Sequence, residues 1–481
     1  MAAASSDAQT ARKRDKQGKQ DKQGKHTLSD ALIETLASRS PHRSTDEEDT
    51  NEPPKTQSEG ARLALILLLG ALLRLAILTL SPGFVANHLS SRVELSTPVT
   101  NHKRLVEGLH LAAHGISPYQ GGLYHQSPLL LMLFKLPYAL LPQFFSDVLY
   151  VAADVTVALL LAKMAVVKAA LPALAGKKAV PGETVFRCLP STVALLYLFN
   201  PLTLATSLSR SSIVFSHLAT ISALYSAIIG LTDCAVILAA VATHLSLYPV
   251  MLIAPICLMT FHLSQHTFKQ QQQTLASSII LTLGKFILAL FALHLSFAAL
   301  YGAEYFSATF DFTLRVADLQ PNVGLFWYFF IEIFDEFRSF FFVVFQLTAL
   351  AFAVPVTWRF RNDPLFGAAM LVGVISALKS YPSWGDLSLF LGLLPLYEEL
   401  AKYLQYTFLS ANLLLYGVGL APVFWYLWIE QGSGNANFFY AATLVYVFGQ
   451  ITLLFDLGGA MLRRELDIHH PETRSRTVVQ E

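Results

Sequence analysis

Long apolar runs follow one another through most of this chain, and they restrict it to one class of fold. The first run, from Leu63 to Leu80, is long enough as a helix to cross most of the roughly 30 Å hydrocarbon core of a bilayer. Only 14% of the 481 residues are charged, whereas soluble domains contain about 25%. Since backbone polar groups inside lipid must be hydrogen-bonded within the chain, such runs predict helices. The sequence therefore predicts an all-α, polytopic bundle of transmembrane helices.

The remaining apolar runs bring the predicted number of spans to about ten to twelve. Before residue 301 they cover 128–142, 145–167, 189–208, 212–230, 232–261 and 277–300. After residue 338 they cover 340–356, 364–379, 384–397, 408–428 and 438–461. Runs that are closely spaced or broken by proline can be counted as one span or as two, which leaves the exact number open. We expect one membrane domain over residues 61–462.

The two ends of the chain are polar. Residues 1–60 contain a basic low-complexity segment and an acidic segment, which bury too little apolar surface to fold, so we expect a disordered cytosolic tail. A short amphipathic helix over 28–36 is the one element predicted within it. Residues 463–481 are the predicted cytosolic C-terminal tail. The net charge of +1 gives no indication of a nucleic-acid partner, and we expect none.

The distribution of Lys and Arg predicts which ends of the spans face the cytosol. Basic residues flank the later spans in alternate loops, at Lys269, Arg359, Lys402 and Arg463. If these loops are cytosolic, three segments lie together in the lumen, at 301–338, 380–385 and 430–437. The long loop 81–127 is also predicted to be lumenal. The basic loop 168–187 disagrees with simple alternation, which leaves the early topology open.

An aromatic segment, Asp318–Phe337, lies within the predicted lumenal region 301–338. Pro321-Asn322 indicates a turn, and the residues after Gly324 have helical spacing. On such a helix Phe326, Phe330, Ile333 and Phe337 share one face, and Glu332, Asp335 and Glu336 share another. Trp327 and Tyr328 are residue types that favour the membrane–water interface. We expect a helix at that interface or inside the bundle, and an ordinary aromatic packing seam is the alternative.

Two further segments carry candidate ligand-binding side chains at predicted lumenal ends of spans. Lys379, in Lys-Ser-Tyr-Pro, would neutralise a phosphate group, or instead reach the interface or pair with Asp386. Asn435 and Asn437 lie in the stretch from Gly432 to Tyr440, and their amides suit sugar hydroxyls or phosphate oxygens. The competing interpretation is a tight turn in which Asn adopts left-handed backbone angles.

These three segments resemble the PIG-U family, the U subunits of the GPI transamidase, and the resemblance extends over about residues 63–465. It implies a non-catalytic, multi-pass subunit in the endoplasmic reticulum membrane, with both termini in the cytosol. The expected partners are the other transamidase subunits, including a caspase-like cysteine protease, the GPI glycolipid and the C-terminal signal of the proprotein. We expect the chain to bind and present the glycolipid, and its aromatic grooves would also help to hold the hydrophobic tail of the signal. The residues expected to bind glycolipid are Asn435, Asn437, Lys379, Asp318, Asn322, Trp327 and Tyr328.

The loop 81–127 and several later motifs also resemble the GT-C class of polytopic mannosyltransferases, which implies a GT-C-like membrane fold. The later motifs are Phe199-Asn-Pro201, Ser209-Arg-Ser-Ser212 and His244-Leu-Ser-Leu-Tyr-Pro249. Those enzymes carry a close acidic pair after the first span, whereas the acids in this loop are only Glu94 and Glu107, far apart. An active mannosyltransferase is therefore the alternative function, and the missing pair argues against it. A transporter would predict inverted repeats, and none is visible.

Elsewhere the sequence shows no pattern typical of catalysis or metal binding, so no catalytic residue, metal or cofactor is predicted. Cys188, Cys234 and Cys257 are far apart and form no CxxC motif. Four ionisable residues lie within or beside spans, namely Arg74, Asp154, Asp233 and Asp456. We expect Arg74 to extend to the headgroups, and the acids to form helix-to-helix hydrogen bonds unless they serve a function.

Overall fold

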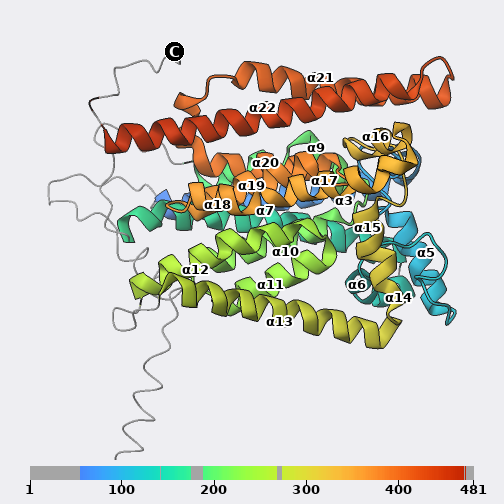
Figure 1. Cartoon of the computed structure of the whole chain (residues 1–481), viewed down its shortest axis with the longest axis horizontal. Coiled ribbons are helices and arrows are strands. Elements are labelled where there is room, and N and C mark those ends of the chain that lie inside the picture. The colour runs from blue at the N-terminus through green and yellow to red at the C-terminus, as the bar shows by residue number, and fades with distance from the viewer. Residues whose placement is uncertain (1–54, 141, 175–187, 268–273, 471, 473–481) are drawn as a thin grey trace, which may run out of the picture.

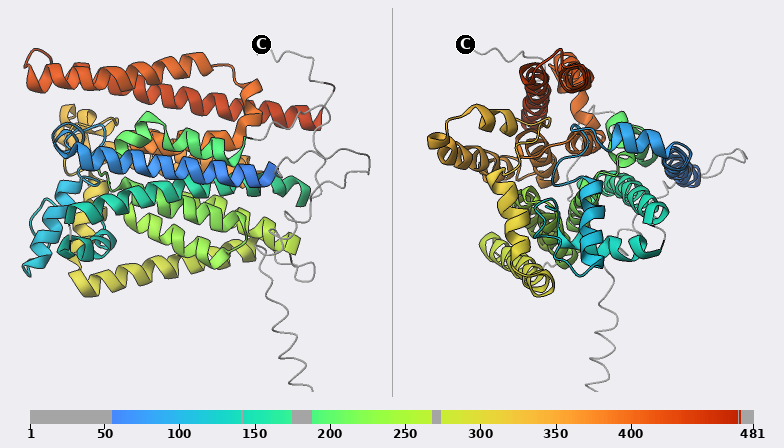
Figure 2. Two further views of the ribbon diagram at one scale, coloured as in Figure 1. Left: turned by 180° about the vertical axis from the view of Figure 1, so that it is seen from behind. Right: turned by 90° about the vertical axis from the view of Figure 1, so that its right-hand side faces the viewer.

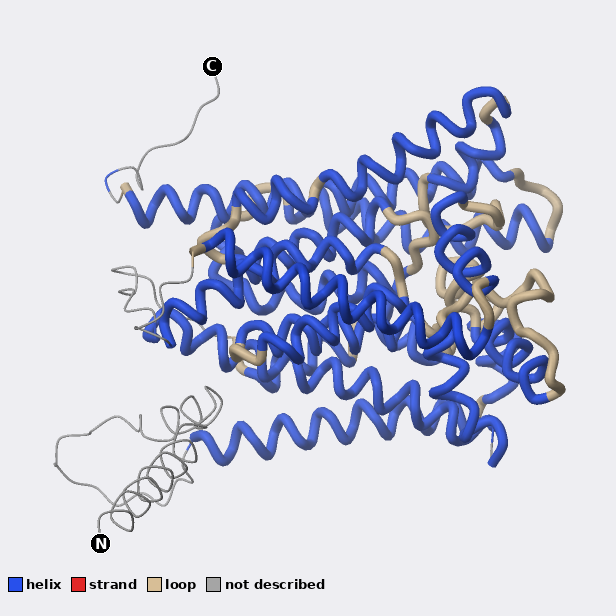
Figure 3. Tube along the Cα trace, turned by 60° about the horizontal axis from the view of Figure 1, so that its bottom comes forward, coloured by secondary structure: helices blue, strands red, loops and turns tan. Residues whose placement is uncertain are grey.

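The computed structural model describes residues 55–140, 142–174, 188–267, 274–470 and 472. These residues form helices and loops without any strand, which confirms the predicted all-α bundle (Figure 3). Most helices run side by side along the long axis of the molecule (Figure 1). The helix predicted at 28–36 and most of the two predicted tails lie outside the described residues, and 463–469 belong to the last long helix.

Six helices of the described chain are long and apolar enough to cross a membrane. They are α3 (Lys55–Leu80), α7 (Pro142–Leu174), α13 (Leu275–Tyr301), α17 continued by α18 (Asp335–Ala351 and Ala353–Arg359), α21 (Thr407–Trp425) and α22 (Ala436–His469). The pair α8 (Pro190–Leu198) and α9 (Pro201–Leu208) would be a seventh span, bent by 58°. Asn200 sits at the bend with extended backbone angles, as expected for a residue before proline, and its side chain caps α9.

Shorter apolar helices fill the middle of the bundle. They are α10 (Ile213–Ile228), α11 (Thr232–Leu245), η2 with α12 (Tyr248–Leu252 and Ile253–Thr267) and α19 (Pro364–Leu378), followed by α20 (Trp384–Leu393) and η4 (Leu394–Tyr403). α19 has 15 residues and is therefore only about 23 Å long, yet all of it except Leu378 is buried. Because other helices surround α19, its end can open into irregular backbone without facing lipid. The predicted ten to twelve spans thus divide into six long helices, one bent pair and short inner helices.

The remaining short elements gather at one end of the bundle, which we call the loop end (right in Figure 1). They are α4 (Pro82–Phe84), η1 (Val85–Leu89), α5 (His102–Ala113), α6 (Pro128–Leu140), α14 (Glu304–Phe306), η3 (Ser307–Asp311), α15 (Phe312–Arg315) and α16 (Phe326–Glu332). The opposite end, where α3 begins and α22 ends, is the tail end (Figures 1 and 2). The prediction of a span at 128–142 is wrong, because α6 has only 13 residues and lies at the loop end. α7 therefore returns directly to the tail end, which removes the conflict over the early topology.

Arg74 does not extend to the headgroups, so that expectation is wrong. Its side chain is fully buried, and its Nε donates to the Asp154 carboxylate on α7 at 2.8 Å. Its Nη2 donates to the backbone carbonyl of Leu198 at 2.8 Å, and the hydroxyl of Tyr197 donates to the other oxygen of Asp154 at 3.0 Å. The pair therefore joins α3, α7 and α8 in the interior, where a lone charge would be costly.

The other two acids in or beside the spans are also hydrogen-bonded. Asp233 on α11 accepts from Lys285 on α13 at 2.6 Å, on an exposed side of the bundle. Asp456 on α22 accepts from the backbone N–H groups of Gln405 and Tyr406, each at 2.8 Å, just ahead of α21. The expected structural hydrogen bonds are thus present for all three acids.

Polar contacts fix the turn after α9 and the helix α5 against α7. Arg210, in the turn after α9, has a left-handed φ of 57° and binds Asp147 of α7 through Nε and Nη2, at 2.5 and 3.0 Å. Next to this pair, His102 of α5 contacts the hydroxyl of Tyr150 at 3.2 Å. Burial, together with the nearby Arg210 charge, lowers the pKa of His102 to about 3, so its ring is neutral at pH 7.

The aromatic segment forms two helices rather than the single one predicted. α16 ends at Glu332, the backbone becomes extended, and α17 begins at Asp335. Phe326 and Phe330 are buried on α16, whereas Phe337 is 55% exposed on α17. The acids account for the difference, because Asp335 and Glu336 occupy the first turn of α17, where the helix dipole favours negative charge.

We expect Asp154→Ala to lower the free energy of unfolding by about 3–5 kcal/mol, because it leaves the Arg74 guanidinium buried without its carboxylate. Asp233→Ala removes the exposed partner of Lys285 and should cost no more than about 1 kcal/mol. Denaturant unfolding of the full chain in detergent measures both. Equal losses of unfolding free energy in the two variants would contradict the stabilising role of the buried Arg74–Asp154 pair.

The folded chain should lose stability as the pH falls. His102 titrates near 3 when folded and near 6.5 when unfolded, so between these values only the unfolded chain takes up the proton. The buried neutral His102 therefore costs no stability above about pH 6.5, and the free energy of unfolding falls as the pH decreases from there towards about 3. His102→Gln should reduce the drop in thermal midpoint between about pH 7.5 and about pH 5. An unchanged drop would assign the pH dependence to other groups.

Candidate functional site

Three segments that are distant in sequence meet at the loop end, as predicted from the positions of Lys and Arg. The hydroxyl of Tyr381 donates to the backbone carbonyl of Asp318 at 2.8 Å and accepts the Asp318 N–H at 3.1 Å. The hydroxyl of Tyr328 donates to the side-chain oxygen of Asn437, and the Tyr440 hydroxyl donates to a carbonyl at the start of α16. The regions 318–328, 379–386 and 435–440 therefore form one structural unit, which we call the junction.

Asn322 holds a turn inside the junction and is fully buried. Its side-chain oxygen accepts the backbone N–H of Gly324 at 2.8 Å, and its amide nitrogen donates to the carbonyl of Gln320 at 3.1 Å. Gly324 packs so closely on Pro382 that an added Cβ would lie 2.6 Å from the proline ring. Asn322 and Gly324 thus shape the loop against the Lys-Ser-Tyr-Pro segment.

Asp318 connects the junction to the loop 81–127. Its carboxylate accepts a hydrogen bond from Arg104 of α5 at 3.0 Å and from the backbone N–H of Gln320 at 3.0 Å. The side chain is 32% exposed, so a charged group at the surface could still reach it. Burial raises the pKa of Tyr381, which keeps its hydroxyl protonated and able to donate to Asp318.

Trp327 lies in the interior rather than at an interface. It is fully buried in an aromatic cluster, 6.0 Å from the ring of Phe439 and 6.4 Å from that of Trp428. Its indole Nε1 is buried without a hydrogen-bond partner in the described part of the chain. The cluster joins α16 to the ends of α21 and α22, so of the two interpretations of the aromatic segment the packing seam fits Trp327 better.

Asn435 and Asn437 lie exposed where α22 begins. Asn435 has extended backbone angles and caps the helix, because its side-chain oxygen accepts the N–H groups of Asn437 and Phe438 at 3.1 and 3.4 Å. The left-handed residue of this turn is Gly432, with a φ of 62°, and not an asparagine. Beside Asn437, the rings of Tyr328 and Tyr440 stack with centroids 4.5 Å apart. The amide nitrogens of both asparagines therefore lie at an exposed surface that also contains these two tyrosine rings.

Lys379 ends α19 and is buried, which excludes a side chain that reaches an interface. Its Nζ lies 2.6 Å from one carboxylate oxygen of Asp386, so the predicted alternative of this ion pair is confirmed. The other oxygen of Asp386 accepts the backbone N–H of Ser383 at 2.8 Å and completes a capping box at the start of α20.

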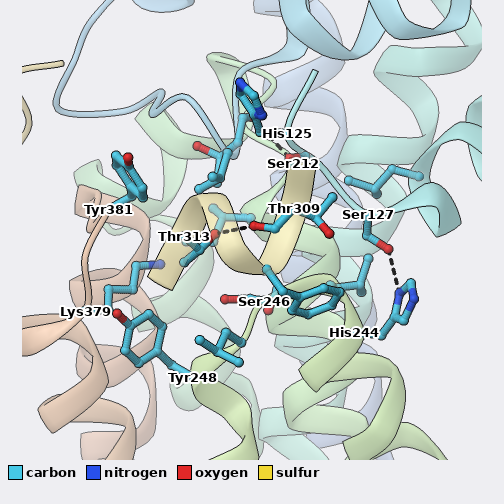
Figure 4. Close-up of a pocket in the computed structure, with 18 residues that line it drawn as sticks. His125, Ser127, Ser212, His244, Ser246, Tyr248, Thr309, Thr313, Lys379 and Tyr381 are labelled. Atoms are coloured by element: carbon cyan, nitrogen blue, oxygen red, sulfur yellow. Dashed lines mark hydrogen bonds between the residues drawn. The ribbon is translucent and has the colours of Figure 1, made fainter. Parts of the chain in front are cut away.

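Two adjoining cavities lie beside Lys379, under the loop end. The first holds about 640 Å³ including its mouth, and Figure 4 shows polar side chains from several segments around it. They include His125, Ser127, His244, Ser246, Thr309 and Thr313. None of these was predicted as a site residue, although His125-Gln-Ser-Pro128 and His244-Leu-Ser-Leu-Tyr-Pro249 stand out as motifs. The sequence signal that could have identified these residues is the pairing of a His with a nearby Ser in each motif. The second cavity, of about 370 Å³ including its mouth, has His217 and Asp386 among the residues that line it.

Glu94, one of the two acids of the loop 81–127, is held in an ion pair. Glu94 is fully buried, and its two carboxylate oxygens accept from Arg92 at 2.9 and 3.1 Å. Burial raises the pKa of Glu94, and the Arg92 charge opposes that rise. Among the described residues no group of three or more His, Cys, Asp or Glu side chains is placed to hold a metal ion. The three cysteines are unpaired and differ in exposure.

A family model described as GPI transamidase subunit PIG-U matches residues 68–446, which contain the whole junction and both cavities. The chain belongs to the PIG-U family. The match confirms the resemblance seen in the three segments of the junction.

The similarity between this chain and curated relatives extends over nearly the full length of those relatives. The chain is 33% identical to the human GPI-anchor transamidase component PIGU, over 85% of this chain and 96% of that protein. It is 35% identical to the GPI transamidase component GAB1 of Saccharomyces cerevisiae, over 84% of this chain and 96% of that protein. The corresponding protein of Cricetulus griseus is 34% identical.

We expect Gly324→Ala to destabilise this PIG-U chain by about 1–3 kcal/mol, because the new methyl group would overlap the ring of Pro382. Gly83→Ala is the matched control, since a Cβ at Gly83 meets no atom within 4 Å. Thermal unfolding in detergent measures both variants. A Gly324→Ala chain as stable as Gly83→Ala would show that the junction is not closely packed.

Proposed function

We propose that this chain is a non-catalytic membrane subunit of the GPI transamidase complex, and that it binds the GPI glycolipid and presents it for attachment to proteins. Its relatives are named as transamidase components, and the match extends over nearly their whole length. Cleavage of the proprotein belongs in this proposal to another subunit, the expected caspase-like cysteine protease. The chain itself offers Cys188, Cys234 and Cys257 far apart, and burial raises the pKa of the Cys188 thiol, which lowers its reactivity.

The outer surface at the start of α22 supports the glycolipid proposal best. It combines the amides of Asn435 and Asn437 with the stacked rings of Tyr328 and Tyr440. Amide groups can donate to sugar hydroxyls and phosphate oxygens, and a tyrosine ring can pack against the apolar face of a sugar. Below this surface α21 and α22 expose large apolar side chains such as Phe448 and Phe455, against which acyl chains can lie.

The other four predicted ligand residues take different parts in this proposal. Asn322 and Trp327 are buried and position the surface from behind, through the turn at Gly324 and the aromatic cluster. Asp318 is partly exposed and paired with Arg104, and in this proposal its carboxylate accepts from an amine or hydroxyl of the glycolipid at the edge of the junction. Lys379 is buried and lines the two internal cavities instead of the outer surface. The apolar faces of α21 and α22 are also where the hydrophobic tail of the C-terminal signal would lie.

We place the protein in the endoplasmic reticulum membrane with its loop end in the lumen. α3 begins and α22 ends at the tail end, which supports the assignment of both termini to the cytosol (Figure 1). The junction then lies on the side where the proprotein and the glycan head group are found.

The test separates ligand binding from helix capping. Asn435→Ser keeps a capping oxygen, and Asn437→Asp keeps an acceptor for the Tyr328 hydroxyl, but both remove amide N–H donors. In cells lacking the native gene, we expect the double variant to reduce a GPI-anchored surface reporter at least about tenfold, since two lost donors to a charged or sugar group cost about that much. The other transamidase subunits should still co-purify with it.

Asn412→Ala is the matched control, because it removes an exposed amide on α21 away from the junction. Its reporter level should equal that of the wild-type chain. Normal anchoring in the double variant would remove the surface from the glycolipid site. Loss of both the reporter and the co-purified subunits would make this turn structural.

A further inference from the structure

A second binding site lies inside the bundle, apart from the outer surface. We infer that the two cavities beside Lys379 bind the phosphate group of a membrane lipid, as a phosphate monoester or diester. Both cavities are lined by Ile213, Ser216, Ser246 and Lys379, so these residues form their common wall. The inference stands on these cavities alone and holds whether or not the outer surface binds the glycolipid.

Lys379 is the cation of this site. It is 5% exposed, and its side chain extends from the end of α19 towards the first cavity (Figure 4). An ammonium group can donate three hydrogen bonds, and Asp386 accepts one of them at 2.6 Å. Because Ser383 fixes the other oxygen of Asp386, the carboxylate holds the ammonium group in place and leaves its other hydrogens for a ligand.

The N-terminus of α10 faces the same cavity through Ile213 and Ser216. Such termini favour anions, because their first N–H groups have no acceptor within the helix and the helix dipole is positive there. Ser212 occupies the capping position of this 16-residue helix but does not cap it. Its hydroxyl instead lies within hydrogen-bond distance of the carbonyl of Thr100 and the side chain of Gln126. The N–H groups of Val214 and Phe215 already donate to the carbonyls of Ser211 and Ser212, at 3.4 and 3.1 Å, so this terminus offers a bound anion the helix dipole and the N–H of Ile213.

Two buried histidines add polar atoms without partners. His217 is 4% exposed and lines the second cavity beside Lys379, and its Nε2 has no hydrogen-bond partner among the described residues. His244 lines the first cavity. The hydroxyl of Ser127 accepts the N–H of Leu129 and lies 2.8 Å from His244 Nδ1; in the tautomer in which Ser127 donates to Nδ1, the His244 proton is on Nε2. That nitrogen is also buried without a partner in the described chain. Such atoms are costly unless a ligand completes them.

The donors and charges favour phosphate over other ligands. Asp386 is the one acidic side chain among the described residues that line the cavities, and Lys379 already neutralises it, so a metal ion is not favoured. A phosphate group has several oxygens that can accept from Lys379, the α10 terminus and histidine N–H groups together. Apolar residues of the first cavity, Leu130, Leu245 and Leu247, provide a surface for the attached hydrocarbon chain. A lipid is therefore the expected source of the phosphate.

Binding of lysophosphatidic acid, a single-chain lipid with a phosphate monoester, tests the inference in the full chain purified in phosphate-free detergent. Monoacylglycerol lacks the phosphate, and inorganic phosphate lacks the chain. We expect lysophosphatidic acid to bind at least about tenfold more tightly than either, because charge-assisted hydrogen bonds and the apolar wall both contribute. Equal binding of monoacylglycerol would overturn the site. Equal binding of inorganic phosphate would overturn the assignment to a lipid.

The double variant Lys379→Gln/Asp386→Asn removes both charges without leaving one buried alone, and we expect it to weaken lysophosphatidic acid binding about tenfold or more. Lys379→Arg keeps the charge and should retain binding, which controls for a general loss of structure. Lys285→Gln/Asp233→Asn makes the same two charge changes in an exposed pair and should bind as wild type. A folded double variant that binds normally would overturn the inference. Asn435→Ser/Asn437→Asp should leave this binding unchanged, so failure of the two sites can be distinguished.

Discussion

Three buried pairs of a cation and a carboxylate determine how the helices of this protein meet. They are Arg74 with Asp154, Arg210 with Asp147, and Lys379 with Asp386. An unpaired charge in an apolar interior is far more costly than a paired one, so each pair restricts the relative positions of the segments that carry its members. The first joins α3 to α7, and the second holds the turn after α9 against α7. The third lies beside the cavities, so the same constraint that orders the helices also places the internal site.

The long helices enclose shorter ones, and this arrangement makes room for polar function. α19 is nearly all buried and too short to cross a bilayer alone, so it ends within the protein, at Lys379. Backbone that leaves α19 is surrounded by protein rather than lipid, and its polar groups pair there: the N–H of Ser380 donates to the Tyr248 hydroxyl, and the N–H of Trp384 donates to the carbonyl of Glu94. α21 and α22 form an outer layer of their own, joined to the loop end by the cluster around Trp327 (Figure 2).

The seven residues proposed to bind glycolipid fall into an outer and an inner group. Asn435, Asn437 and Tyr328 form an open surface of amides and rings, whereas Asn322 and Trp327 support it from within. Asp318 lies at the edge, and Lys379 belongs to the cavities. In the proposed function the outer surface binds the polar glycan through hydrogen bonds on a rigid helix end. The buried cation Lys379 belongs to the separate internal site proposed for a lipid phosphate.

The sequence by itself determined the class of fold, the family and the three segments of the junction, because composition and the length of apolar runs report directly on the solvent around a chain. It also identified Lys379 and the two asparagines as polar groups at the ends of spans. Only the tertiary structure decided that α6 stays at one end, that Arg74 pairs with Asp154, and that Asn435 caps α22. It alone revealed the cavities, whose walls come from segments that are distant in sequence. Local patterns report which side chains avoid water, but the partner of a buried polar group depends on how distant helices pack.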